Sequence, residues 1–106
     1  MVSEAILQEV TRRLVEKFHP VAIILFGSQA RGTADDRSDV DLIVLCDSVT
    51  DRNALEAEMI AAMRGIPVPI DLLAYTPEEF RIESSMQGSV AHPAGHEGKV
   101  VYDRAA

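Results

Sequence analysis

The sequence predicts a small α/β protein of the α+β kind, in which three to four strands form a mixed β-sheet packed with helices. Two aliphatic runs, at residues 21–26 and 40–46, indicate strands that are covered on both faces. Segments with helical spacing of apolar residues precede the first run and follow the second. The chain has 106 residues, and we expect residues 1–106 to form a single domain.

The first helix is predicted between a cap and a proline. Ser3 is a typical N-cap residue, and Pro20 disfavours helical geometry in His19, the residue before it. We therefore expect the helix to end near His19. Apolar residues at helical spacing give it one buried face: Leu7, Val10, Leu14 and Phe18.

The rest of the chain continues the alternation. A short helical turn to Gly32 and an exposed loop over 33–38 are expected before the second strand. A helix then starts near Thr50 or Asp51 and stops at Gly65, with Met59 and Met63 in the core. A strand over 68–75 comes next, followed by a helix that Thr76 caps and whose Phe80 and Met86 face inward. The chain then continues with a loop over 87–98 and a short edge strand over 99–102.

Charge and cysteine content restrict the function. The net charge of −7 disfavours direct contact with a polyphosphate backbone, so we expect no nucleic-acid partner. A nucleotide held through metal ions is compatible with that charge. The single cysteine, Cys46, excludes an internal disulfide and is expected to pack in the core. No signal peptide or membrane span is predicted, and we expect a cytoplasmic protein.

Acidic residues stand where apolar ones are expected. Asp39 and Asp41 open the second strand and, because side chains alternate, point to the same side. Asp71 lies inside the third apolar strand, and the three carboxylates can converge if the two strands are neighbours. Oxygen ligands of this kind suit Mg²⁺ or Mn²⁺. The alternative is that these acids face solvent or pair with an arginine.

A glycine-serine turn follows the first strand. Gly27 permits close approach of a phosphate, and Ser28 adds a hydroxyl donor at the start of the following helical turn. Arg31 could pair with a phosphate oxygen. Taken separately, Gly-Ser is a common turn and Arg31 an ordinary surface residue. The spacing excludes a P-loop. His92 and His96 have the spacing of a helical metal pair, but Pro93 and Gly95 make a loop the expected structure.

Taken together, these residues resemble a known family. Gly27-Ser28, ten residues, then Asp39-Val40-Asp41 is similar to the motif of the nucleotidyltransferase superfamily with the DNA polymerase β-like palm. The chain resembles the minimal nucleotidyltransferases, the MntA-like antitoxins of HEPN-domain toxins. The specific motif covers residues 26–45, and Asp71, the helix start at Thr76 and the ending Gly98-Lys99-Val100-Val101-Tyr102 extend the likeness.

The resemblance implies roles for the matching positions. Asp39, Asp41 and Asp71 would be the catalytic residues and the ligands of two Mg²⁺ ions, or of Mn²⁺. Gly27 and Ser28 would hold the β- and γ-phosphates of a nucleoside triphosphate, with Arg31 beside them.

The implied reaction is transfer of a nucleoside monophosphate, AMP from ATP, to a hydroxyl. Because the chain comprises little beyond the palm, we expect a second polypeptide to supply the acceptor, and the resemblance suggests a HEPN toxin whose tyrosine is AMPylated in a hetero-oligomer. One alternative is a non-catalytic antitoxin that neutralises its partner by binding alone. Another is an aminoglycoside-type nucleotidyltransferase that acts on a small molecule.

Overall fold

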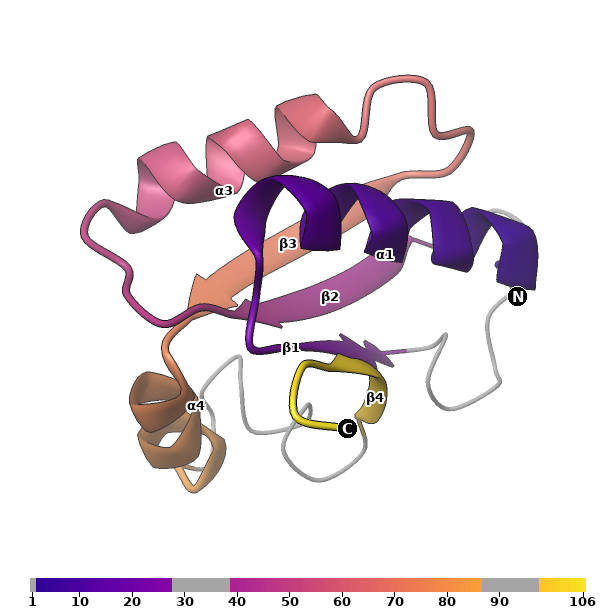
Figure 1. Ribbon diagram of the computed structural model, residues 1–106. Helices are drawn as coiled ribbons and strands as arrows, with labels where there is room; N and C mark the ends of the chain where they lie inside the picture. The colour runs from indigo at the N-terminus through magenta and orange to yellow at the C-terminus, as the bar shows by residue number, and fades with distance from the viewer. Residues whose placement is uncertain (1, 28–38, 87–97) are drawn as a thin grey trace.

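The computed structural model, which describes residues 2–27, 39–86 and 98–106, has one four-stranded sheet in the order β3-β2-β1-β4. β1 pairs antiparallel with β2 and with β4, whereas β2 and β3 are parallel. The predicted mixed sheet is confirmed (Figure 1). The elements are α1 (Glu4–Phe18), β1 (Ala22–Phe26), β2 (Val40–Leu45), α3 (Arg52–Ala62), β3 (Ile70–Tyr75), α4 (Pro77–Ser84) and β4 (Lys99–Asp103).

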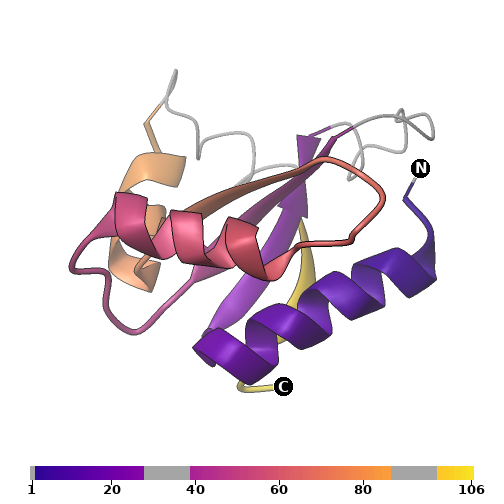
Figure 2. The ribbon, with the colours of Figure 1, turned by 90° about the horizontal axis from the view of Figure 1, so that it is seen from above.

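The two long helices cover one face of the sheet. α1 and α3 lie side by side above β1, β2 and β3, as the two views show (Figure 1, Figure 2). Alternate residues of the central strands project into the core beneath these helices, among them the fully buried Ile23, Leu42 and Val44. α4 lies against the other face, where Phe80 packs on a second cluster of Ile24, Ile43, Leu45 and Tyr75.

The ends of α1 agree with the prediction from its flanking residues. The Ser3 hydroxyl accepts a hydrogen bond from the Ile6 amide at 3.2 Å, which satisfies one of the free donors of the first turn. His19 takes the left-handed conformation with φ of 49° and donates its amide to the Val15 carbonyl. Pro20 follows and is buried, so the helix ends where the proline requires it to end.

The caps of the later helices are also the predicted ones. Asp51 caps α3 by accepting from the Ala54 amide at 3.1 Å. Thr76 and Glu79 form a reciprocal capping box on α4, with Pro77 at the first helical position. These side chains set the entry angle of each helix from the strand before it.

Some sequence predictions need correction. β3 starts at Ile70 rather than at Val68, after a segment that contains Pro67 and Pro69. Met86 does not face inward: 53% of it is exposed, because α4 ends at Ser84 and Met86 lies beyond the helix.

Other predictions are confirmed. Cys46, Met59 and Met63 are buried, and β4 is an edge strand, although it extends to Asp103. The predicted turn to Gly32, the loop over 33–38, most of the loop over 87–98, and both His92 and His96 lie outside the described residues. Within the described residues, none of the helices has the length and apolar character that crossing a membrane requires.

Candidate active site

Asp41 and Asp71 are neighbours across the only parallel strand pair of the described sheet. The register aligns Asp41 of β2 with Asp71 of β3, and on its other side Asp41 stands opposite Phe26 of β1. The condition for the carboxylates to converge, that the third strand lies beside the second, is therefore met. Each aspartate is the second residue of its strand. Two carboxylates from distant parts of the sequence thus meet at one end of the sheet.

The strand pleat determines which face these acids occupy. Val40 and Leu42, which flank Asp41, are buried in the core beneath α1 and α3, so Asp41 projects from the opposite face. Ile70 and Leu72 flank Asp71 in the same way. Asp41 therefore lies at the end of the row formed by Ile43 and Leu45 on the face that α4 partly covers. This position explains why it is half-buried although it carries a charge.

The surroundings of Asp41 disfavour its charged form. Its pKa is raised first by burial, then by the negative charges of Asp71 and Asp39, and last by a hydrogen bond with the Asp71 carboxyl group. Asp39 and Asp71 are themselves exposed. Among the described residues, the cluster therefore carries more negative charge than its neighbours balance, and a bound cation would relieve this repulsion.

Gly27 brings a backbone segment against the same carboxylate. It follows Phe26, the residue opposite Asp41, and has φ of 72°, a conformation that L side chains rarely adopt. A Cβ atom built on Gly27 would lie 2.5 Å from Oδ2 of Asp41. The end of β1 and the acidic pair therefore form two adjoining sides of one site. Ser28 and Arg31, the other predicted phosphate-binding residues, lie outside the described residues.

Comparison with known proteins identifies the family. The family model described as the nucleotidyltransferase domain matches residues 7–92. The chain belongs to this nucleotidyltransferase family. The match contains Gly27, Asp41 and Asp71, so the site described above lies within the nucleotidyltransferase domain. The chain is thus a nucleotidyltransferase by family, in agreement with the resemblance read from its motif.

A sequence relative carries a more specific name. A protein of Methanocaldococcus jannaschii, provisionally named a protein adenylyltransferase, is 47% identical over 49 residues. The aligned part is 44% of this chain and 33% of the relative. The chain therefore spans about a third of the length of that relative.

Solved structures share the fold. A provisionally named nucleotidyltransferase from Sulfolobus solfataricus has a TM-score of 0.65 and 18% identity, covering 95% of this chain and 80% of that chain. A chain of the mutant toxin–antitoxin complex MntA–HpeT has a TM-score of 0.62 and 19% identity, covering 97% and 74%. A toxin–antitoxin structure with AMP-PNP has a TM-score of 0.59 and 20% identity, covering 91% and 73%. At these identities the likeness concerns the fold.

The donor chemistry of the site suits a hard divalent cation, although the ligands do not form a complete cluster. Asp41 and Asp71 are paired through a hydrogen bond, and Asp39 is near enough for its charge to raise the pKa of Asp41. Across residues 2–27, 39–86 and 98–106, no group of three His, Cys, Asp or Glu side chains is arranged to hold a metal. The structure thus brings two of the three predicted ligands together and leaves Asp39 exposed beside them.

A separate groove has a different character. It measures about 510 Å³ and lies between α1 and β4, with a lining of Glu4, Leu7, Gln8, Thr11, Arg12, Val15 and Val101. None of these residues belongs to the acidic site. The groove has no pair of carboxylates from neighbouring strands and no tight glycine turn, so the chemistry favours the acids, and not this groove, as the candidate active site.

Proposed function

We propose that this nucleotidyltransferase is metal-dependent and transfers a nucleoside monophosphate, AMP from ATP, to a hydroxyl of a partner protein. The observation that carries the proposal is the alignment of Asp41 with Asp71, with the backbone of Gly27 against the Asp41 carboxylate. In this proposal the turn at Gly27 contacts the phosphates of the substrate, and the two carboxylates hold the cations bound to the same substrate. Two Mg²⁺ ions, or Mn²⁺, would neutralise the triphosphate and align the attacking and leaving oxygens.

The residues of the chain have distinct tasks in this proposal. Asp41, Asp71 and Asp39 together hold the cations. The positions of Asp41 and Asp71 on adjacent strands fix the spacing of these two carboxylates. Gly27 keeps the end of β1 free of a side chain that would enter the site. Ser28 and Arg31 contact the phosphates. Asp71 is the more exposed member of the pair, which supports a role for it in accepting the proton of the acceptor hydroxyl.

For the acceptor, we propose a HEPN-domain toxin that forms a hetero-oligomer with this chain in the cytoplasm. Two of the structures that share the fold come from toxin–antitoxin complexes, and one of these contains AMP-PNP. The relative from Methanocaldococcus jannaschii is named for transfer to protein. A tyrosine hydroxyl of the toxin is the proposed acceptor, and its modification by AMP would silence the toxin.

The test is transfer of label from α-labelled ATP. The full chain is incubated with Mg²⁺ and the product of the adjacent gene, and label on that partner is measured. The variant Asp39→Asn with Asp41→Asn should lose transfer by at least about a hundredfold, since removal of a metal ligand removes most of the charge neutralisation. Addition of EDTA should have the same effect on the wild type.

Asp47→Asn is the matched control. Asp47 follows the other end of β2, is exposed and pairs with Arg104 at 2.9 Å, so this variant removes a nearby acid without touching the site. It should keep full transfer. If the double variant still neutralises the partner in cells and no label is seen with the wild type, the chain acts by binding alone. Label on a small hydroxylated molecule in place of protein would favour the aminoglycoside-type reaction.

A further inference from the structure

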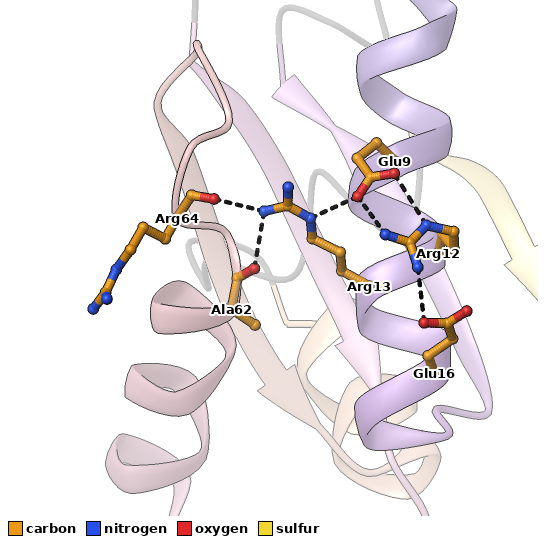
Figure 3. A network of polar contacts seen from close by, with 6 residues as sticks. All are labelled: Glu9, Arg12, Arg13, Glu16, Ala62 and Arg64. Atoms are coloured by element: carbon orange, nitrogen blue, oxygen red, sulfur yellow. Dashed lines mark hydrogen bonds and ion pairs between the residues drawn. The ribbon is translucent and has the colours of Figure 1, made fainter.

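Arg13 makes three hydrogen bonds, two of which link α1 to the end of α3. Its Nε donates to Glu9 at 2.7 Å within α1, and its Nη1 donates to the carbonyls of Ala62 at 3.1 Å and Arg64 at 2.7 Å (Figure 3). The side chain is 28% exposed, and its bonds to Glu9 and Ala62 are partly shielded from water, whereas its bond to Arg64 is exposed. Arg13 thus holds a segment that lies about fifty residues later in the sequence.

One of the two carbonyls that Arg13 binds belongs to the end of a helix, and the other lies in the turn that follows it. Ala62 is the last residue of α3, and its carbonyl cannot be reached by an amide of the next helical turn. A guanidinium group at this place also complements the negative end of the helix dipole. Arg13 therefore fixes the position where the chain leaves α3 and turns toward β3.

The segment between Arg64 and β3 is anchored to the rest of the protein from Ile66 onward. The Ile66 amide donates to the Met63 carbonyl at 3.0 Å, and both Ile66 and Val68 pack on the main core. Pro67 and Pro69 restrict the backbone between them. Gly65, which directly follows Arg64, is the conformationally permissive residue of the segment, and we expect a displacement at Arg64 to shift Ile66 and the residues that follow it.

This segment ends at the acidic site. The Pro69 carbonyl accepts a hydrogen bond from the Val40 amide at 2.9 Å, and Val40 lies between Asp39 and Asp41. Two residues after Pro69 comes Asp71. The start of β3 and the start of β2 are therefore joined at the point where the carboxylates emerge.

We propose that Arg13 is a positioning residue for the active site: by holding the end of α3 it sets how closely the start of β3, and with it Asp71, approaches Asp41. This inference rests on the proposed metal-dependent transfer. Arg13 itself touches neither acid. Its effect reaches Asp71 through the segment from Arg64 to Pro69.

Arg12 provides a matched control on the same helix. Its guanidinium binds Glu9 and Glu16, both within α1, and among the residues that the structure describes it forms no hydrogen bond or ion pair with α3 (Figure 3). Arg12→Met and Arg13→Met each remove one positive charge and one partner of Glu9. Methionine keeps an unbranched apolar stem in both variants. Only the second variant releases the carbonyls of Ala62 and Arg64.

The first measurement is amide hydrogen exchange of the full-length variants. Arg13→Met should speed exchange of the Val40 amide, and of the amides of the non-proline residues in 65–72, by about fivefold or more relative to Arg12→Met. This is the effect expected for local opening of a released segment. The second measurement is transfer to the partner as a function of Mg²⁺. Arg13→Met should raise the Mg²⁺ concentration for half-maximal transfer by about fivefold, within the range for coupling through packed networks.

Two further variants separate positioning from general stability. Arg13→Lys can still donate to both carbonyls and should restore most of the Mg²⁺ response. Arg52→Met removes a comparable tie between α3 and the far end of β3, where Arg52 donates to the Ala74 carbonyl at 2.8 Å. It should lower thermal stability without changing the Mg²⁺ midpoint.

The outcomes decide as follows. The inference is overturned if amide exchange at Val40 and residues 65–72 is equally fast in Arg12→Met and Arg13→Met. It is also overturned if the Mg²⁺ midpoint of transfer is unchanged in Arg13→Met, or if Arg52→Met shifts that midpoint as much as Arg13→Met does. If the wild type transfers no nucleotide, the proposed function is wrong. The exchange comparison then decides alone whether Arg13 holds the start of β3.

Discussion

A Cβ atom on Gly27 would lie 2.5 Å from Oδ2 of Asp41, so the backbone at the end of β1 sits directly against a carboxylate of β2. Gly27 also has φ of 72°. Close approach and a left-handed backbone independently require glycine at this position. The atom that a methyl group would meet is the end of a side chain, which means that the chain can still fold if Asp41 turns away from its place.

Gly27→Ala is therefore expected to disable the site more than it destabilises the fold. The left-handed backbone should cost about 1 kcal/mol of unfolding free energy. Displacement of Asp41 should lower transfer by about a hundredfold or more, because small misplacements of a catalytic group are costly. Urea unfolding and the labelled-ATP assay measure the two effects.

Gly65→Ala is the control for backbone strain. Gly65 has φ of 88°, but a Cβ atom there would meet nothing within 4 Å. Because Gly65 lies in the segment between Arg64 and β3, activity is compared at saturating Mg²⁺, where the variant should show a similar loss of stability and keep its activity. Equal losses of activity in the two variants would mean that strain alone, and not the contact with Asp41, explains the effect.

Asp41→Asn should make the metal-free protein more stable at pH 7. The pKa of Asp41 is raised on folding, so its contribution to stability is present below the unfolded value of 3.8 and is lost as pH rises through the folded pKa. Asparagine removes this penalty. With the discount that solvent screening of a half-buried group requires, we expect a gain of about 0.5–1 kcal/mol, or a rise in Tm of about 3–5 °C.

The same melting experiment is repeated with and without Mg²⁺. In EDTA, Asp41→Asn should melt above the wild type, and addition of Mg²⁺ should raise the Tm of the wild type alone. Asp47→Asn should not become more stable, because the pKa of Asp47 is lowered by its hydrogen bond to Arg104. A lower Tm for Asp41→Asn in EDTA would show that Asp41 stabilises the fold.

The sequence signals that succeeded are local ones. Ser3, Asp51 and Thr76 each accept a hydrogen bond from an amide three residues later, so the cap is encoded next to the helix that it starts. The β-branched and aliphatic runs likewise identified β1 and β2. Asp71 could be selected because a charged residue inside an apolar strand conflicts with its neighbours.

The relations that could not be predicted join distant parts of the chain. The register that aligns Asp41 with Asp71 depends on strand pairing, and a shift of one residue would turn one acid to the other face. The role of Arg13 is of the same kind, because nothing near Arg13 in the sequence indicates that its hydrogen-bond acceptors are the carbonyls of Ala62 and Arg64. The metal cluster was predicted from three acids, while the described structure pairs two of them.

Acid should weaken the tie between α3 and α4. Arg52 binds Glu79 at 2.6 Å, and the pKa of Glu79 is lowered chiefly by this hydrogen bond. Its contribution to stability is therefore present above the unfolded value of 4.5 and is lost as pH falls through the folded pKa. Glu79→Gln keeps a residue suited to the capping box with Thr76 and removes the charge.

Urea midpoints of wild type and Glu79→Gln should accordingly differ most near neutral pH and converge as pH falls below about 4.5, the unfolded value. Glu78→Gln, which breaks an exposed pair with Arg81 in the same helix, should differ less from the wild type throughout. A gap between wild type and Glu79→Gln that stays constant with pH would assign the loss to packing or capping, not to the charge.

The β3 edge of the sheet is closed by two side chains of α3, and opening it should promote self-association. The Ala74 amide donates to Glu56 at 2.8 Å, and the Ala74 carbonyl accepts from Arg52 at 2.8 Å. Replacement of both residues by alanine exposes an edge strand with free backbone groups, which is a template for pairing with another chain.

In this double variant the unfolding free energy should fall by about 1–3 kcal/mol, and light scattering on heating should begin at a lower temperature. Glu58→Ala, on an exposed position of the same helix, should match the wild type in both measurements. If the double variant loses stability yet remains monomeric on heating, Arg52 and Glu56 stabilise the strand without guarding its edge.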